Sequence, residues 1–450
     1  MNRGLIRFVV IFSIAFFFSC NEQEVAVNNR EINNPEFLHR GIRRLNDVVI
    51  YEIFSPPVAS RIFSYASLAA YESIRWTDTS YPSIVSKLNG FSEMPAPEPG
   101  KKYQFAIAGI KALFEVTSRL TFTKDSSLIT LREILKEMKA NGIDEETYNN
   151  SLAFGDSVAN AIWKRASTDH YKETRGMARY TPSVITGKWK NTSPDYLDAV
   201  EPFWTKMMPM VMDSSAQFKP VPPPPYDLNT KSQFYKEMKE VLDTVAALTE
   251  EQKNIARFWD DNAAAVTHVG HMMFANKKPS PGGHWMNITA IAAKKANADL
   301  LQSAFSYATV AVTMYEAFIS CWDEKFRSEY IRPITAINEF LDKNWQPFLQ
   351  TPPFPEYTSG HSVVSSSIAT VLTQLYGDNF AFTDDYELPY IGIQRSFPSF
   401  IKASEEACVS RLYGGIHFRS AILNGRTQGR NLGQHIVEKL NIQQFRLTGS

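Results

Sequence analysis

The sequence of 450 residues predicts an all-α protein. Apolar residues recur at helical spacing along most of the chain, as in the stretch that contains Phe37, Ile42 and Leu45. Sustained strand alternation is not found, and the Asn-Gly pairs typical of hairpins are scarce. We therefore expect one extended body, in which an amino-terminal helical half, residues 35–225, packs on a carboxy-terminal helical bundle, residues 226–450.

Residues 1–19 have the layout of an export signal, with basic residues before an apolar run too short for a convincing membrane span. Cys20 follows the small Ser19 and resembles the lipidated cysteine of a bacterial lipoprotein, with Phe17 where an aliphatic residue is usual. A plain signal peptide with an incidental cysteine is the alternative. We expect an exported protein, in the periplasm or at the outer membrane, that reaches a membrane only through this lipid anchor. Residues 20–34 are polar and Asn-rich, which predicts a flexible tether.

The body of the chain predicts mainly helices. The expected helices are, in order, residues 37–53, 62–74, 101–120, 128–141, 145–165, 230–245, 250–259, 287–322, 333–342, 361–376, 402–412 and 418–440. Asn287–Trp322 is rich in Ala, Leu and Met and predicts one long buried helix. Residues 173–228 are instead rich in prolines and aromatic residues, which predicts a long ordered excursion with a stiff polyproline II piece at Pro222–Pro225.

The charge balance excludes one class of partner. Lys plus Arg and Asp plus Glu are equal at 47, so the formal net charge is zero. This argues against a polycation that coats nucleic acid or anionic lipid, and we expect no nucleic-acid partner. The cysteines beyond Cys20, which are Cys321 and Cys408, are interpreted as buried thiols because two distant cysteines form no disulfide framework.

Candidate site residues gather between 322 and 417 in three clusters. In the first, Lys325 and Arg332 are seven residues apart, so they would share a face if the segment were helical. Pro333 more naturally opens a helix, because its ring suits the first helical position. A solvated helix face is the alternative for this pair.

The second cluster is Ser359-Gly360-His361, which leads into an apolar helix. The first N–H groups of a helix are free and the helix dipole favours negative charge there. Ser359 adds a hydroxyl, Gly360 permits close approach, and His361 can exchange protons near neutral pH. Ordinary N-capping by Thr358 or Ser359 is the alternative.

The third cluster joins Arg411 to His417 through Gly414-Gly415, which lets the backbone bend. The planar fork of Arg411 suits a tetrahedral oxyanion. Together the three clusters predict a pocket for a multiply charged tetraoxo anion, with two histidines left for coordination or proton transfer. Asp260-Asp261-Asn262 could orient a pocket Arg or His through a carboxylate, or could cap a helix end.

The order K-x6-R-P, S-G-H and S-R-x5-H resembles the type 2 phosphatidic acid phosphatase and vanadium-dependent haloperoxidase superfamily, over residues 322–430. Phe258-Trp259 and Pro281–Trp285 extend the resemblance toward residue 255. The resemblance implies a helical-bundle haloperoxidase-like fold in which the carboxy-terminal bundle is catalytic. It also implies that vanadate is the cofactor and that His417 ligates vanadium, or is the nucleophile of a phosphatase.

The resemblance further assigns roles to the remaining motif residues. The vanadate oxygens would be held by Lys325, Arg332, Ser359, Gly360 and Arg411. His361 would be the acid–base group, and Lys325 would polarise the bound peroxide. Hydrogen peroxide and a halide would be the substrates.

Three details favour the peroxidase over the phosphatase. Trp322 and Phe354 match positions that line the vanadate pocket in haloperoxidases of the chloroperoxidase type. The phosphatase pattern carries an Asp four residues after its last His, where this chain has Ala421. Integral-membrane lipid phosphatases also carry several spans, which this sequence does not predict.

Bacterial iodoperoxidases are the most similar branch, so iodide is the expected halide and bromide the second candidate. An exported acid phosphatase and an inactive surface lipoprotein that binds a ligand are the alternatives.

Overall fold

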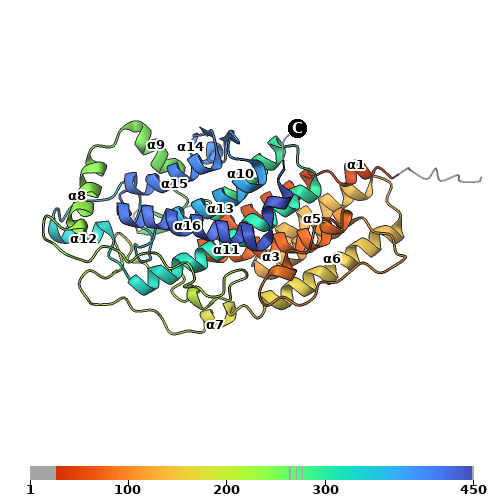
Figure 1. Ribbon diagram of the computed structural model, residues 1–450, viewed down its shortest axis with the longest axis horizontal. Coiled ribbons are helices and arrows are strands. Elements are labelled where there is room, and N and C mark those ends of the chain that lie inside the picture. Colours follow the sequence, from red (N-terminus) through yellow and green to blue (C-terminus); the bar gives the residue numbers. More distant parts are fainter. Residues whose placement is uncertain (1–26, 263–264, 270, 276, 448–450) are drawn as a thin grey trace, which may run out of the picture.

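Long helices run side by side along the longest dimension of the protein (Figure 1). The computed structural model describes residues 27–262, 265–269, 271–275 and 277–447. Its α-helices are α1 (Asn29–Ile32), α2 (Glu36–Tyr51), α3 (Pro56–Ile74), α4 (Phe105–Leu120), α5 (Lys124–Lys139), α6 (Glu145–Ala166), α7 (Tyr171–Arg175), α8 (Gln233–Ala246), α9 (Glu250–Phe258), α10 (Pro281–Lys295), α11 (Leu300–Ser328), α12 (Pro333–Phe340), α13 (Gly360–Tyr376), α14 (Leu388–Ile391), α15 (Phe400–Tyr413) and α16 (Arg419–Leu440). Short 3-10 turns lie at Arg75–Thr77, Val85–Lys87, Trp204–Lys206 and Ile442–Phe445. The predicted all-α class is confirmed.

Strands were not expected, and the few that form are short. β1 (Val266–Val269) pairs antiparallel with β2 (Met272–Ala275), and β3 (Phe382–Asp384) pairs antiparallel with β4 (Arg395–Phe397). Each pair is an isolated two-stranded hairpin beside the helices. Strands of three or four residues give little alternation for a sequence pattern to detect.

Helix α11 is the central element, and it joins the two halves. It packs against α3 on one side and against α13 on another. Its side chains from Phe305 to Trp322 are buried all round, which is typical of a helix inside a protein. A continuous hydrophobic core runs from Ile32 in the amino-terminal half to Ile442 near the carboxyl end. The two halves therefore share this core.

One continuous helix was predicted for Asn287–Trp322, but the chain forms two helices there. Helix α10 ends at Lys295, and Asn297 adopts a left-handed conformation with φ +51°. Asp299 then caps α11 and forms a capping box with Gln302. Asn tolerates the left-handed region, and Asp with Gln three residues later is a helix-start signal, so the break is encoded locally.

Glycines on α16 bring it into contact with α13. A Cβ atom on Gly429 would lie 2.3 Å from the carbonyl oxygen of Val363, and one on Gly433 would lie 2.6 Å from that of Ser367. These distances are too short for any larger residue without movement of the backbone. The close approach fixes α16 beside α13, whose amino-terminal end carries Ser359-Gly360-His361.

The export signal and Cys20 lie outside the described residues. Part of the expected tether is instead packed on the body: α1 forms, Ile32 is fully buried, and the N–H of Asn28 donates to the carbonyl oxygen of Asn141 at 3.0 Å. Burial of one large aliphatic side chain compensates part of the ordering cost of such a polar segment. Among the described residues, no helix combines the length and the apolar character that a membrane span requires.

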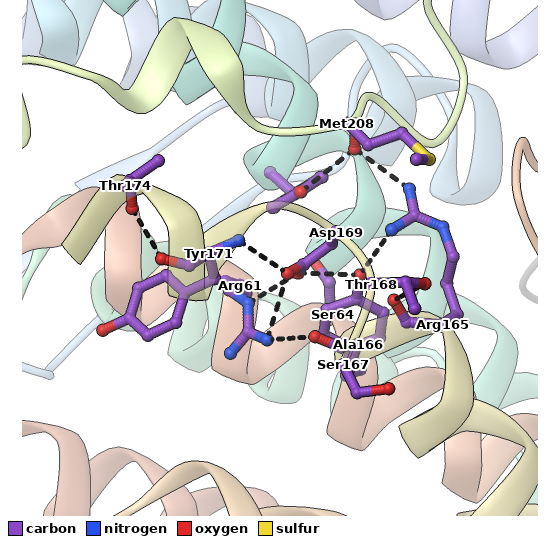
Figure 2. Close-up of polar contacts among 12 residues, drawn as sticks. Arg61, Ser64, Arg165, Ala166, Ser167, Thr168, Asp169, Tyr171, Thr174 and Met208 are labelled. Carbon is purple, nitrogen blue, oxygen red and sulfur yellow. Dashed lines mark hydrogen bonds and ion pairs between the residues drawn. The ribbon is translucent and has the colours of Figure 1, made fainter. Parts of the chain in front are cut away.

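The excursion expected at 173–228 is held on the body by buried polar contacts at its base (Figure 2). Arg61 Nε on α3 donates to Asp169 Oδ2 at 2.6 Å, and Arg61 Nη2 donates to the carbonyl oxygen of Ala166 at 2.6 Å. Arg165 Nη2 donates to the carbonyl oxygen of Met208 at 3.0 Å. The Glu316 carboxylate of α11 accepts the backbone N–H groups of Met210, Val211 and Met212. The Glu316 contacts fix residues 210–212 of the excursion against α11.

Candidate functional site

The three clusters converge at one end of the bundle, around a cavity of about 190 Å³. Lys325 is near the end of α11, Arg332 caps α12, Ser359 caps α13, Arg411 is near the end of α15, and His417 lies in the turn before α16. The cavity is lined by Ile53, Ser55, Pro56, Val200, Asp260, Asp261, Asn262, Pro281, Phe318, Trp322, Pro352, Phe354, Gly360, His361, Arg411, Ile416 and His417. Lys325, Arg332 and Ser359 are fully buried and are not among the lining residues.

Lys325 and Arg332 do not share a helix face, although their spacing of seven residues would allow this if the segment were helical. Helix α11 ends at Ser328, where Glu329 takes a left-handed conformation with φ +47°. Arg332 then precedes Pro333, which opens α12 as the sequence predicted. The two cations come together because the chain turns, and not because of helical periodicity.

Lys325 holds the loop that leads to α13. Its Nζ donates to the carbonyl oxygens of Pro355, Glu356 and Thr358 at 2.9, 3.1 and 2.6 Å. Nζ also lies 5.0 Å from the centre of the Phe354 ring. Burial disfavours the charged amine and lowers the pKa of Lys325 to about 7. Its charge therefore depends on whether an anion is nearby.

Arg332 determines which nitrogen of His417 carries the proton. Arg332 Nη1 lies 3.2 Å from His417 Nε2 and donates to the carbonyl oxygen of Ile416 at 2.8 Å. Since a guanidinium can only donate, Nε2 must be the acceptor and the ring proton lies on Nδ1. Burial, followed by the charge of Arg332, keeps the pKa of His417 well below its usual value. The ring is thus a neutral imidazole whose Nε2 lone pair accepts from Arg332 in the anion-free site.

Glu356 orients His417 and was missed by the sequence analysis. Its Oε1 lies 2.9 Å from His417 Nδ1, and it also accepts the N–H of Phe418 at 2.9 Å. This carboxylate performs the task for which an Asp was sought at position 421, where Ala421 is buried. The sequence offered one signal for this role. Glu356 stands between Pro355 and Tyr357, and a Glu that becomes fully buried is almost always paired.

The amino-terminal end of α13 faces the cavity. Ser359 Oγ accepts the N–H of Ser362 at 3.3 Å, so the capping alternative is correct for this hydroxyl. Gly360 is in the first helical turn, and a Cβ built on it would meet only Trp322, at 3.9 Å. The N–H groups of Gly360 and His361 have no intrahelical acceptor, because they belong to the first turn. This end of the helix therefore offers donors and open space to an anion.

His361 is the first member of a buried chain of imidazoles and carboxylates. Its Nε2 lies 3.6 Å from Asp261 Oδ2, while Asp261 Oδ1 accepts from His284 Nδ1 at 3.0 Å. His284 Nε2 lies 2.8 Å from Asp384 Oδ2. Burial, followed by the charge of Arg411, lowers the pKa of His361 to about 4. Two flanking carboxylates outweigh burial for His284 and hold its pKa well above the usual value. Asp261 therefore lies beside the pocket histidine without a hydrogen bond to it, and the orienting role of the 260–262 stretch stays a prediction.

Arg411 completes the cationic side of the cavity. Its Nη2 donates to the carbonyl oxygen of Trp259 at 2.5 Å, and its Nε donates to Ser410 Oγ at 2.9 Å. Burial lowers its pKa. Within the described part of the chain, none of Lys325, Arg332 and Arg411 forms an ion pair with a carboxylate. Three buried cations without such a partner leave positive charge that an anion would neutralise.

The other side of the cavity is apolar, and part of it comes from the amino-terminal half. Trp322 and Phe354, both predicted to line the pocket, do so, with their ring centres 5.0 Å apart. Trp322 Nε1 donates to the carbonyl oxygen of Val200 at 3.1 Å, which brings the excursion to the cavity. Ile53 and Pro56 complete this side from the α2–α3 connection. The site was predicted within residues 226–450 alone, so these contributions from the amino-terminal half were not expected.

Comparison with known proteins agrees with this geometry. The family model of the VCPO second helical-bundle domain matches residues 305–444. The structure is similar to a crystal structure described as the first bacterial vanadium-dependent iodoperoxidase, with a TM-score of 0.85 and 45% sequence identity. That match covers 90% of this chain and 97% of the other.

More distant structures share the fold. The holo and apo forms of a bacterial vanadium-dependent chloroperoxidase match with TM-scores of 0.64 and 0.63, both at 16% identity. These matches cover 87% and 86% of this chain and 94% of the other chain in each case. No curated protein matches the chain by sequence.

Proposed function

Since the chain belongs to the vanadium haloperoxidase superfamily, we propose that it oxidises iodide with hydrogen peroxide in the cavity described above. The observation that carries the proposal is the neutral His417 imidazole, with Nε2 as its acceptor atom, beside three buried cations that have no carboxylate partner among the described residues. An imidazole lone pair suits a metal, and the cations suit the oxygens around it.

The residues present fit a vanadate anion. His417 Nε2 would be the metal ligand, and the oxygens would be held by Lys325, Arg332, Ser359, Gly360 and Arg411. The open space at Gly360 and the free N–H groups of the first turn of α13 favour a multiply charged oxyanion. When bound, vanadate supplies a Lewis-acid centre that activates hydrogen peroxide toward the halide.

The protein's own groups hold this site in one arrangement. Glu356 fixes the ring of His417 and keeps its proton on Nδ1, so that Nε2 faces the cavity. Lys325 holds the loop before Ser359 through three carbonyl oxygens. Trp322, Phe354 and Phe318 exclude water from one side, which strengthens the interaction of the cations with an anion.

His361 is the group that moves protons. Halide, hydrogen peroxide and one proton yield hypohalous acid and water, so each turnover consumes a proton. His361 borders the cavity, and its ring is kept neutral by burial and by Arg411 until negative charge arrives. Asp261 opposes that effect from 3.6 Å. We assign His361 as the acid–base residue, with the Asp261 carboxylate beside its ring.

The test is an assay of the purified protein with and without added vanadate. Hydrogen peroxide with iodide or bromide should give vanadate-dependent halide oxidation, faster with iodide. His417→Ala should abolish it, whereas His435→Ala, a half-buried histidine on α16 that does not line the cavity, should retain it. Rapid hydrolysis of a phosphomonoester without halide oxidation would overturn the proposal in favour of a phosphatase.

A further inference from the structure

The end of helix α2 has an unusual residue at its turning point. The N–H of Ile53 donates to the carbonyl oxygen of Ile50, and the N–H of Phe54 donates to that of Val49, both at 3.2 Å. This is the Schellman arrangement, which requires a left-handed residue at the position of Ile53. Its φ is +56°. Glycine is the usual residue there, because a Cβ atom disfavours that conformation and a β-branched side chain disfavours it most.

The same chain closes another helix in the same way without a β-branched residue. After α10, the N–H of Asn297 donates to the carbonyl oxygen of Lys294 at 3.1 Å, and the N–H of Ala298 donates to that of Ala293 at 2.9 Å. Asn297 has φ +51°. Since Asn adopts this conformation more readily, the turn itself gives no reason for an isoleucine. We therefore looked to the side chain of Ile53 to explain why an isoleucine occupies this position.

That side chain lies at the cavity. Ile53 lines it and is 39% exposed, so it stands at the mouth and not in the core. Pro56, Val200 and Trp322 line the same apolar side. The neighbouring Phe54 is used differently, since its ring stacks on Phe122 at 5.3 Å. The strained backbone thus places an aliphatic group beside the site, where strain is commonly connected with function.

We propose that Ile53 is a specificity-determining residue that favours a large, weakly hydrated halide over a small, strongly hydrated one. The inference rests on the proposed halide oxidation and deepens it. An anion that approaches the cations from the mouth must lose water on its apolar side. A large monovalent anion loses less hydration energy there than a small one, so an aliphatic contact discriminates in favour of iodide. Without Ile53, water would reach that side and the discrimination would decrease.

Three variants separate the side chain from the backbone strain. Ile53→Gly removes both, Ile53→Ala removes the side chain but keeps the Cβ strain, and Asn297→Gly relaxes the equivalent turn away from the cavity. The vanadate-loaded enzymes are compared by kcat/KM for iodide and bromide, and by Tm. We expect the iodide-to-bromide ratio to fall at least about threefold in both Ile53 variants and to stay unchanged in Asn297→Gly. Ile53→Gly should raise the Tm by about 1–2 °C, because the strain is relieved.

A second measurement keeps this inference separate from the proposed function. Crystals soaked in iodide or bromide give halide occupancies by anomalous scattering, whether or not the enzyme turns over. Iodide should occupy the cavity more fully than bromide in the wild type, and the preference should shrink in Ile53→Ala. An unchanged ratio in both measurements would overturn the role of Ile53. Halide binding without oxidation would overturn the proposed function and leave this inference to be decided by the occupancies.

Discussion

Glu356 and His417 form the pair on which the geometry of the site depends. Glu356 Oε1 lies 2.9 Å from His417 Nδ1, and both side chains are buried. Since Glu356 accepts the Nδ1 proton and holds the ring, removal of the carboxylate leaves Nδ1 without this partner and frees the ring to rotate. Glu356→Ala should lower vanadate affinity by about 10- to 100-fold. Glu356→Gln, whose amide oxygen can still accept from Nδ1, should lose less.

The measurement for this pair is the vanadate concentration that restores half of the halide-oxidising activity to vanadate-free enzyme. Glu405→Gln, on the outer face of α15 among Arg and Lys side chains, is the matched control. Equal affinities in the wild type and Glu356→Ala would contradict the orienting role.

Glu356 also illustrates what a sequence can and cannot reveal about such a site. The motif residues Arg411 and His417 were predictable, because each belongs to a short pattern with a fixed spacing. Glu356 precedes His417 in the chain, whereas the phosphatase pattern places its orienting carboxylate four residues after the last His. Its role depends on how the 352–359 loop meets the turn before α16, which no local periodicity reports.

In the fold, too, features set by neighbouring residues were predictable, whereas contacts between residues distant in the sequence were not. Helix ends such as Pro333 and Ser359 were predicted from capping chemistry. The contributions of Ile53 and Val200 to the cavity were not, because these residues reach it only through the packing of α2, α3 and the excursion on α11. Contacts between residues far apart in sequence leave no signal in a single chain.

His284 should be important for stability. It is fully buried between Asp261 and Asp384, and the two carboxylates keep its pKa above the usual value. His284→Ala would leave two buried carboxylates without their shared cation, which costs about 3–5 kcal/mol. Denaturant unfolding at pH 7 measures the loss, with His435→Ala as the control. A change below about 1 kcal/mol would show that the cluster does not need the imidazolium.

Ala421→Asp tests whether position 421 can take the orienting role. Ala421 is fully buried among Phe418, Ile422 and Tyr357, and its carbonyl oxygen accepts the N–H of Ser359 at 3.1 Å. A carboxylate there would lack a partner, because His417 Nδ1 already donates to Glu356. We expect a loss of about 2–4 kcal/mol in unfolding free energy and no gain in activity. Ala421→Ser, similar in size, is the control. Higher vanadate affinity in Ala421→Asp would contradict the assignment.

Membrane attachment is predicted to depend on Cys20. If this residue is lipidated after cleavage of residues 1–19, the full chain expressed in a bacterium should be found with the membranes. Cys20→Ser should move it to the soluble exported fraction, since the lipid chains supply the attachment. Cys408→Ser, a buried thiol far along the chain, is the control. Mass spectrometry of the mature amino terminus provides the direct measurement, and an unmodified terminus would refute the lipoprotein prediction.

Anion binding should be coupled to the protonation of Lys325. Its pKa is about 7 in the anion-free site because burial disfavours the charged amine, and a bound dianion would raise that pKa. Below pH 7 the amine is already protonated, so binding takes up no proton. Above pH 7 binding must protonate it, so affinity should fall with rising pH, by up to about tenfold per unit.

Sulfate is the suitable probe for this coupling, because it is a tetraoxo anion whose charge stays constant between pH 6 and 9. Isothermal titration calorimetry should give a nearly constant affinity from pH 6 to 7 and a declining one above. Lys325→Arg keeps its charge throughout this range and should flatten the decline. Glu356, whose pKa burial raises to about 8, would add a decline in the same direction, and Glu356→Gln measures that part. If the wild type and Lys325→Arg decline equally, Lys325 is not the group that couples anion binding to pH.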